Sequence, residues 1–316
     1  MSAGVRQRPQ HASREDLRPP FRDGDGALVV PAPAKLNLFL HITGRRPDGM
    51  HTLQTLFQFL DWGDSLRLAP TRDPVFEREP ALPGIPAGED LALRAARLLA
   101  ERVGWAGGVR ITVEKRLPVG GGLGGGSSDA ASTLLALNRL WGCGLSRAEL
   151  GELGAALGAD VPVFIGGRAA WAEGIGEHLT PVEDLPEPWY LVVWPAGAGV
   201  STREAFGDPA LTRNHPEVRI LDFSQGRCSN DFAPVVERLR PEIARLREWL
   251  DRNTSAPGRL TGSGSCMFAE CEDRERAEAL RARVPAPWGT AVARGRNRHP
   301  LADWAFGDGR EPAEPV

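Results

Sequence analysis

The sequence lacks the features that mark several large classes of protein. Its four cysteines, Cys143, Cys228, Cys266 and Cys271, form no C-x-x-C pair and have no paired histidines at zinc-site spacing. A structural zinc site and a disulfide framework are therefore disfavoured, and a reducing, cytoplasmic compartment fits. No apolar run approaches the length of a membrane span.

Excess positive charge is also missing. The net charge is −3 over 316 residues, whereas surfaces that bind nucleic acid are usually strongly basic. Residues 1–26 have few apolar residues and no signal-peptide core, so we expect a disordered N-terminal extension there. The remaining length suits about two domains. We place them at 27–185 and 186–316, with the boundary in the proline-rich segment 181–188.

What the sequence has in excess is glycine, in a run within residues 118–128. Six of the seven residues from Gly120 to Gly126 are glycine, which favours a tightly bent backbone that presents bare N–H groups. Ser127-Ser128-Asp129 then predicts a helix N-cap, and apolar residues at helical spacing follow. A glycine-rich turn that opens into a helix N-terminus typically binds phosphate.

The glycine run does not match the two best-known phosphate loops. It contains no lysine, so the P-loop pattern fails. Gly120, Gly122 and Gly125 formally fit a dinucleotide fingerprint, but the preceding residues 109–117 lack the long apolar strand of that fold. A flexible surface loop is the alternative interpretation, and the amphipathic helix that follows favours phosphate binding over it.

Two polar positions stand out elsewhere. Val29–Ile42 alternates as a strand, which places Lys35 and Asn37 on one face. The segment Gly158-Ala159-Asp160-Val161-Pro162 follows a helix that is predicted to begin with a capping box at Ser146. Taken singly, a solvated lysine and a turn aspartate are the ordinary interpretations of Lys35 and Asp160.

Several stretches together resemble the GHMP small-molecule kinases. Residues 31–38, 118–128 and 260–266 resemble the three ordered motifs of that superfamily. Residues 48–55 and 158–164 resemble its members that act on 4-diphosphocytidyl-2-C-methyl-D-erythritol (CDP-methylerythritol). The resemblance extends over about residues 29–296. It implies an α+β, two-domain GHMP kinase fold with the active site in the cleft between the domains.

The resemblance also implies roles for individual residues. Asp160 would be the catalytic base, and Lys35 would offset charge on the transferred phosphoryl group. The glycine loop would hold ATP with Mg²⁺, and the hydroxyl of Ser127 or Ser128 would face the metal. The implied ATP-binding residues are Pro118, Val119, Gly120, Gly121, Gly122, Leu123, Gly124, Gly125, Gly126, Ser127 and Ser128. The implied substrate-binding residues are Asn37, Met50, His51, Thr202, Phe206 and Gly262.

One position departs from the family pattern. Met50 stands where the family often has tyrosine, so Phe206 is expected to carry the stacking on the cytosine of the substrate.

The implied activity is transfer of a phosphoryl group from ATP to the 2-hydroxyl of CDP-methylerythritol, in the methylerythritol phosphate route to isopentenyl diphosphate and isoprenoids. We expect a cytoplasmic monomer or weak homodimer with no nucleic-acid or membrane partner. Two alternatives stay open: a GHMP kinase for homoserine, mevalonate or a sugar, and a nucleotide-binding protein without catalysis. Residues 49–52 indicate a cytosine pocket, which a kinase for homoserine, mevalonate or a sugar would not need. The presence of both Lys35 and Asp160 favours an enzyme over a non-catalytic nucleotide-binding protein.

Overall fold

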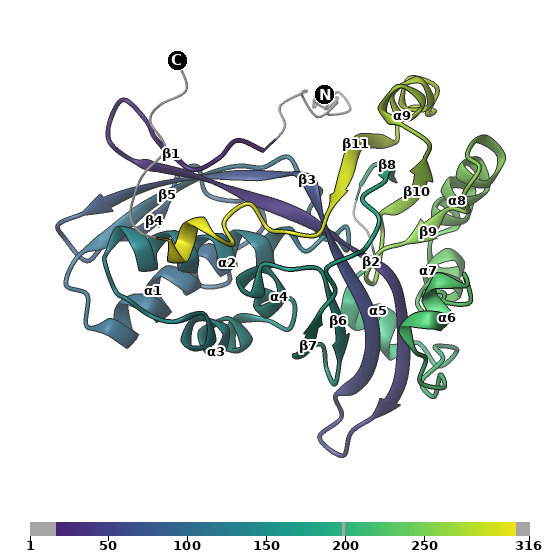
Figure 1. Cartoon of the computed structure of the whole chain (residues 1–316), viewed down its shortest axis with the longest axis horizontal. Coiled ribbons are helices and arrows are strands. Elements are labelled where there is room, and N and C mark those ends of the chain that lie inside the picture. Colours follow the sequence, from purple (N-terminus) through teal and green to yellow (C-terminus); the bar gives the residue numbers. More distant parts are fainter. Residues whose placement is uncertain (1–16, 198–199, 308–316) are drawn as a thin grey trace, which may run out of the picture.

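The computed structural model describes residues 17–197 and 200–307. The strands form one sheet with the order β1-β2-β3-β11-β8-β10-β9 (Figure 1). Outside this order, β5 and β6 pair with β3, β4 pairs with β5, and β7 pairs with β6. The strands are β1 (Phe21–Arg22), β2 (Leu28–Arg45), β3 (His51–Thr71), β4 (Phe76–Arg78), β5 (Gly108–Glu114), β6 (Ala170–Glu173), β7 (His178–Pro181), β8 (Trp189–Trp194), β9 (Arg259–Leu260), β10 (Met267–Cys271) and β11 (Gly289–Arg296).

Helices lie in two groups. In the N-terminal half they are α1 (Leu91–Val103), α2 (Gly125–Leu140), α3 (Arg147–Leu157) and α4 (Val161–Gly166). In the C-terminal half they are α5 (Thr202–Gly207), α6 (Ile220–Ser224), α7 (Ala233–Leu239), α8 (Pro241–Asn253) and α9 (Arg274–Arg281), and a 3₁₀ helix, η1 (Trp304–Phe306), follows β11. None of the helices in the described ranges is long and apolar enough to cross a membrane.

The long antiparallel strands β2 and β3 connect the two halves (Figure 1). They are 18 and 21 residues long and pair from Leu28 opposite Leu68 to Arg45 opposite His51. Apolar side chains of β2 enter three core clusters in turn: Leu28, Val30 and Ala32, then Ala34, Leu36 and Leu38, then Leu40 and Ile42. One hairpin is therefore built into the core of both halves.

The helix after the glycine run is the central helix of the N-terminal half. All side chains of α2 from Ser128 to Asn138 are buried, as expected for a helix enclosed by other elements on every side. The capping box predicted at Ser146 is present at the start of α3. The mixture of helices with a mainly antiparallel sheet confirms the α+β prediction.

The structure corrects the expected N-terminal extension. Residues 17–26 belong to the fold, because β1 pairs with β2 and Asp23 forms an ion pair with Arg67 at 2.5 Å. The Asp23 carboxylate also accepts hydrogen bonds from the backbone N–H groups of Asp25 and Ala27. Polar contacts hold this segment in the fold, so its shortage of apolar residues did not indicate disorder. The rest of the predicted extension, residues 1–16, lies outside the described residues.

The predicted C-terminal domain is also corrected at its end. After β11 the chain returns to the N-terminal half, where Leu301 and Ala305 join the core cluster that contains α2. The guanidinium group of Arg147 lies 4.3 Å from the ring centre of Phe306. The domain from 186 onward therefore ends before this segment, and residues 308–316 lie outside the described part of the chain.

Candidate active site

The glycine run forms the start of α2. This helix begins at Gly125 with Gly124 as its N-cap residue, so the cap predicted at Ser127-Ser128-Asp129 is wrong and the glycines form part of the first turn. Gly120, Gly122 and Gly124 have φ angles of 71°, 79° and 72°, a region that glycine adopts without strain. The first turn of an α-helix has N–H groups without intrahelical acceptors and carries the positive end of the helix dipole. This arrangement suits an anion.

The segment 260–266 packs backbone to backbone against this loop. The N–H of Cys266 donates to the carbonyl of Gly121 at 3.0 Å. A Cβ atom added to Gly122 would lie 2.2 Å from the carbonyl oxygen of Thr261. A Cβ atom added to Gly262 would lie 2.9 Å from the carbonyl oxygen of Gly122. Only glycine permits this approach, so the third motif is fixed directly onto the glycine loop.

Lys35, on β2, places its amine among three oxygen acceptors. Nζ donates to Asn37 Oδ1 at 2.5 Å and to the carbonyl of Gly122 at 3.0 Å, and it lies 3.3 Å from Asp160 Oδ2. The Lys35 side chain is 3% exposed, whereas that of Asp160, the residue before α4, is 37% exposed. The predicted common face of Lys35 and Asn37 is confirmed. A buried ammonium thus lies beside a carboxylate that solutes can reach.

A cavity of about 650 Å³ opens onto this ion pair. Its volume falls within the roughly 300–1,000 Å³ of typical small-molecule sites. The predicted catalytic and substrate-binding residues all contribute to its walls: Lys35, Asn37, Met50, His51, Asp160, Thr202, Phe206 and Gly262. Residues from five separate parts of the sequence are therefore brought to one site.

A second cavity, of about 440 Å³, also borders the glycine loop and is lined by the whole run Pro118–Ser127. The two cavities share Gly120, Gly122, Gly124, Ser127 and Thr202 as wall residues, so the loop is a common wall between them. Ser128 behaves differently: it is fully buried, it is not a wall residue of these two cavities, and its hydroxyl has no hydrogen-bond partner in the described chain.

The first cavity also contains a stacked pair of rings. The ring centres of His51 and Phe206 are 4.7 Å apart with an interplanar angle of 18°, and Nε2 of His51 is buried with no partner among residues 17–197 and 200–307. Burial, together with the guanidinium groups of Arg213 and Arg45, lowers the pKa of His51. Its ring is therefore neutral at pH 7 and offers one donor and one acceptor. Met50, 49% exposed, contributes to the wall nearby.

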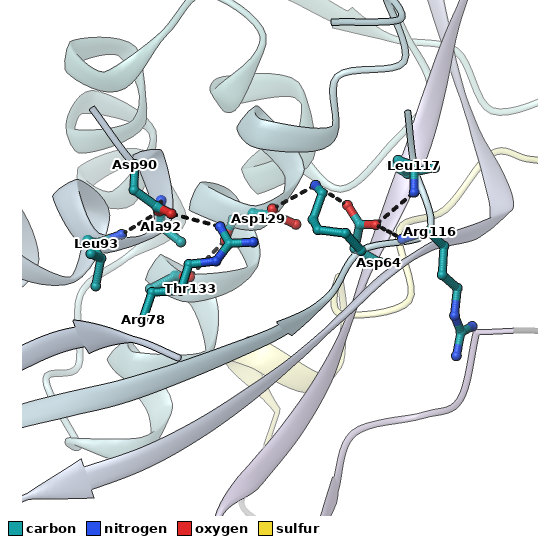
Figure 2. Close-up of polar contacts among 10 residues, drawn as sticks. Asp64, Arg78, Asp90, Ala92, Leu93, Arg116, Leu117, Asp129 and Thr133 are labelled. Carbon is teal, nitrogen blue, oxygen red and sulfur yellow. Dashed lines mark hydrogen bonds and ion pairs between the residues drawn. The ribbon is translucent and has the colours of Figure 1, made fainter. Parts of the chain in front are cut away.

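Beside the glycine loop lies a buried ion network that sequence reasoning missed (Figure 2). Lys115 Nζ lies 2.5 Å from Asp64 Oδ2 and 3.0 Å from Asp129 Oδ2. Arg78 lies 2.7 Å from Asp90, the N-cap residue of α1, and Figure 2 shows this contact beside the network. Lys115 is a wall residue of the second cavity, so the network places an amine beside the glycine loop.

The Asp129 carboxyl is the most perturbed acid of this network. Burial raises its pKa to about 7, against the opposing effect of Lys115, and the nearby Asp64 adds to the rise. Only Asp129 stands in a recognisable sequence pattern, the predicted helix cap, whereas Asp64 and Lys115 belong to no motif. Nothing in the spacing of these three residues indicates that they meet.

Comparisons with known proteins agree with this geometry. The family profile described as "GHMP kinases N terminal domain" matches residues 90–168, and that described as "GHMP kinases C terminal" matches residues 209–290. The chain is 50% identical over 282 residues to the 4-diphosphocytidyl-2-C-methyl-D-erythritol kinase of Cupriavidus metallidurans, which covers 87% of this chain and 95% of the relative. It is 52% identical over 276 residues to the protein of the same name from Nitrosococcus oceani, with coverage of 87% and 97%.

Solved structures give the same result. A crystal structure of 4-(cytidine 5'-diphospho)-2C-methyl-D-erythritol kinase superposes with a TM-score of 0.72 at 36% identity, covering 85% of this chain and 99% of the other. A mevalonate kinase structure, at 15% identity and a TM-score of 0.60, shares the fold over 85% of this chain and 99% of its own. The two-domain GHMP architecture that the motifs implied is confirmed. The chain belongs to the 4-diphosphocytidyl-2-C-methyl-D-erythritol kinase family, within the GHMP kinases.

Proposed function

We propose that the protein transfers the γ-phosphoryl group of ATP to the 2-hydroxyl of CDP-methylerythritol, giving the 2-phosphate and ADP. The observation that carries this proposal is the Lys35–Asp160 pair, 3.3 Å apart, in a cavity that shares the glycine loop as a wall with a second cavity. Such an arrangement suits a phosphate donor on one side of the loop and an alcohol on the other. The names of the relatives support the choice of substrate.

The phosphates of ATP are proposed to lie along residues 118–128. Backbone N–H groups of the first turn of α2 and the helix dipole would hold them, and Lys115 would add positive charge from the wall of the second cavity. Mg²⁺ prefers oxygen ligands and usually bridges substrate phosphates while keeping several waters. Ser127 fits as a protein ligand because it borders both cavities, whereas the Ser128 hydroxyl is buried. The ion would neutralise phosphate charge.

In the proposed transfer, the substrate oxygen forms a bond to the γ-phosphorus while the bond to the oxygen that bridges to the β-phosphate breaks. Asp160 accepts the proton of the 2-hydroxyl. Lys35, held beside Asp160, offsets the negative charge on the moving group. Positioning and charge stabilisation supply most of the catalysis in such transfers.

The cytosine of the substrate is proposed to bind at His51 and Phe206. The buried Nε2 of His51 needs a partner that the described chain does not supply, and a base edge would provide one. Phe206 offers a flat ring for stacking, and Met50 offers a thioether, which contacts π faces less specifically. Homoserine, mevalonate and simple sugars have no group for this surface, which favours CDP-methylerythritol over them.

We place the reaction in the methylerythritol phosphate route to isoprenoids and in the cytoplasm. The four cysteines are free thiols, which suits a reducing compartment. A monomer or a weak homodimer remains our expectation.

The decisive experiment measures ADP release with ATP, Mg²⁺ and CDP-methylerythritol, beside mevalonate, homoserine and galactose. Asp160→Asn and Lys35→Ala are assayed in parallel, with Asp73→Asn as a matched control, because Asp73 is exposed and lies outside both cavities. We expect release only with CDP-methylerythritol, abolished in both site variants and unchanged in Asp73→Asn.

The other outcomes separate the alternatives. Release with a different alcohol would keep the GHMP chemistry and reject the cytosine pocket. Tight ATP binding without release for any alcohol would favour a non-catalytic nucleotide-binding protein.

A further inference from the structure

A buried chain of hydrogen bonds runs behind the Lys35 amine. Thr55 lies on β3, fully buried, and its Oγ1 accepts a hydrogen bond from Asn37 Nδ2 at 2.9 Å. The same hydroxyl donates to the carbonyl of Phe39, at the register shift of β2 between Asn37 and Leu40. The other end of the Asn37 amide, Oδ1, accepts from Lys35 Nζ at 2.5 Å.

The donors and acceptors in this chain permit a single direction. A carbonyl oxygen can only accept a hydrogen bond, so the Thr55 hydroxyl must donate its one proton to the carbonyl of Phe39. The hydroxyl oxygen can then only accept, and the nitrogen of the Asn37 amide must face it. The amide oxygen is consequently turned toward Lys35. If the amide were flipped, its NH₂ group would face an ammonium, with two donors in contact.

The direction of the amide determines where the amine lies. An ammonium has three N–H donors, and the three acceptors around Lys35 Nζ are Asn37 Oδ1, the Gly122 carbonyl and Asp160 Oδ2. Gly122 belongs to the glycine loop and Asp160 to the substrate cavity. Asn37 Oδ1 is the acceptor on the strand side, so it holds the amine between the other two.

We propose that Thr55 is a positioning residue for phosphoryl transfer: its hydroxyl fixes the orientation of the Asn37 amide and thereby holds the Lys35 ammonium against Asp160. The proposal rests on the proposed roles of Lys35 and Asp160. It also assigns to Asn37 a support function beyond the substrate contact that the sequence resemblance implied.

The test compares Thr55→Val, which keeps the shape and removes the hydroxyl, with Thr55→Ser, which keeps the hydroxyl. We expect Thr55→Val to lower kcat by about 10- to 100-fold, because small displacements of a catalytic group are costly, and to leave KM for both substrates within about twofold. Thr55→Ser should retain kcat within about threefold. Thr290→Val is the matched control, since Thr290 is a buried strand threonine that lines neither cavity, and it should not change kcat.

A second variant separates positioning from a general loss of structure. In an Asn37→Asp background, the side chain carries no NH₂ group that could turn toward Lys35. Adding Thr55→Val to Asn37→Asp should lower kcat by less than about threefold, whereas Thr55→Val alone should lower kcat by more in the native background. An equal cost in both backgrounds would overturn the proposal.

A readout that does not use the substrate keeps the test independent of the proposed function. Lys35 and Lys115 are the two lysines of the sequence, so mass spectrometry can follow acetylation of each by an amine-selective reagent. Relative to Lys115, Lys35 should react faster in Thr55→Val and at the native rate in Thr55→Ser. If the native protein phosphorylates no alcohol but Thr55→Val still raises the ratio of Lys35 to Lys115 acetylation, the positioning holds and the proposed function fails. An unchanged ratio in a folded Thr55→Val or, should that variant not fold, in Thr55→Ala would overturn the positioning.

Discussion

Both lysines of the chain lie next to the glycine loop. Of the 38 Lys and Arg residues, only Lys35 and Lys115 are lysines, and each amine contacts carboxylates. A Cβ on Gly124 would lie 3.0 Å from the Lys35 stem, and one on Gly125 would lie 3.4 Å from Lys115 Nζ. A compact ammonium fits where a planar guanidinium would not.

The first prediction follows from this crowding. Lys35→Arg keeps the positive charge, but the guanidinium group is too wide for a position that is 3% exposed and pressed against the loop. We expect kcat to fall by at least about 100-fold, as measured by ADP release. Activity near the native level would show that charge alone is sufficient at this position.

The second prediction concerns Gly124. Gly124→Ala and Gly142→Ala both place alanine at a positive φ, 72° and 64°, and each should lose about 1–2 kcal/mol of unfolding free energy. The two variants differ in the space around the added methyl group. The new Cβ at residue 124 would lie 3.0 Å from Lys35 and from Phe164, whereas the one at residue 142 would meet no described atom within 4 Å.

Only Gly124→Ala should therefore lower kcat, by at least about tenfold. Urea unfolding measures the shared loss of stability, and ADP release measures the difference in rate. Equal rates in the two variants would mean that the close contact with Lys35 is unimportant.

At the scale of elements, local signals predicted most of what lies close together in sequence. The alternation of β2 predicted that Lys35 and Asn37 share a face, and the capping box predicted the start of α3. The start of α2 could not be predicted in the same way, because a glycine in the left-handed region replaced the expected serine cap.

Clusters assembled across the fold had no such signal. Asp64, Lys115 and Asp129 come from β3, the segment after β5, and α2, and they meet only once the helix packs on the sheet. The return of Leu301 to the N-terminal core likewise depends on tertiary packing. The motifs predicted the cavity residues through family resemblance, whereas the supporting contacts of Thr55 emerged only from the structure.

The third prediction concerns Asp129 in α2. Its pKa is raised from 3.8 to about 7 mainly by burial, so the folded state binds a proton that the unfolded state has already lost. Stability therefore falls as pH rises from about 4 to about 7. Asp129→Asn removes this effect, and its advantage over the native protein should grow across that range, to at most about 4 kcal/mol.

Urea unfolding at several values between pH 5 and pH 8 measures this difference. The exposed Asp73→Asn provides the control and should follow the native curve. An advantage of Asp129→Asn that shrinks as pH rises would contradict the assignment of the raised pKa.

At the scale of the whole molecule, the two halves share their longest strands. β2 and β3 pass from the core of one half into that of the other, and β11 pairs with both β3 and β8. The Lys35–Asp160 pair joins β2 directly to the residue before α4. Large domain closure usually needs a few hinge residues in loops or at the ends of elements, and this connection is a continuous sheet.

The fourth prediction follows. The radius of gyration from small-angle X-ray scattering should be the same, within error, for the free protein and for the protein with ADP and CDP-methylerythritol. A compaction on binding would show that the sheet flexes between the halves.

The shared hairpin also has a consequence for the kinetics of encounter. A site that needs no rearrangement of its two halves presents the same shape before and after the ligand arrives, so little binding energy is diverted into reshaping the protein. Association should then appear in stopped-flow records as one phase whose rate rises linearly with ligand concentration, with no slower saturating step. The rigidity of two strands would in this way set the time course of recognition.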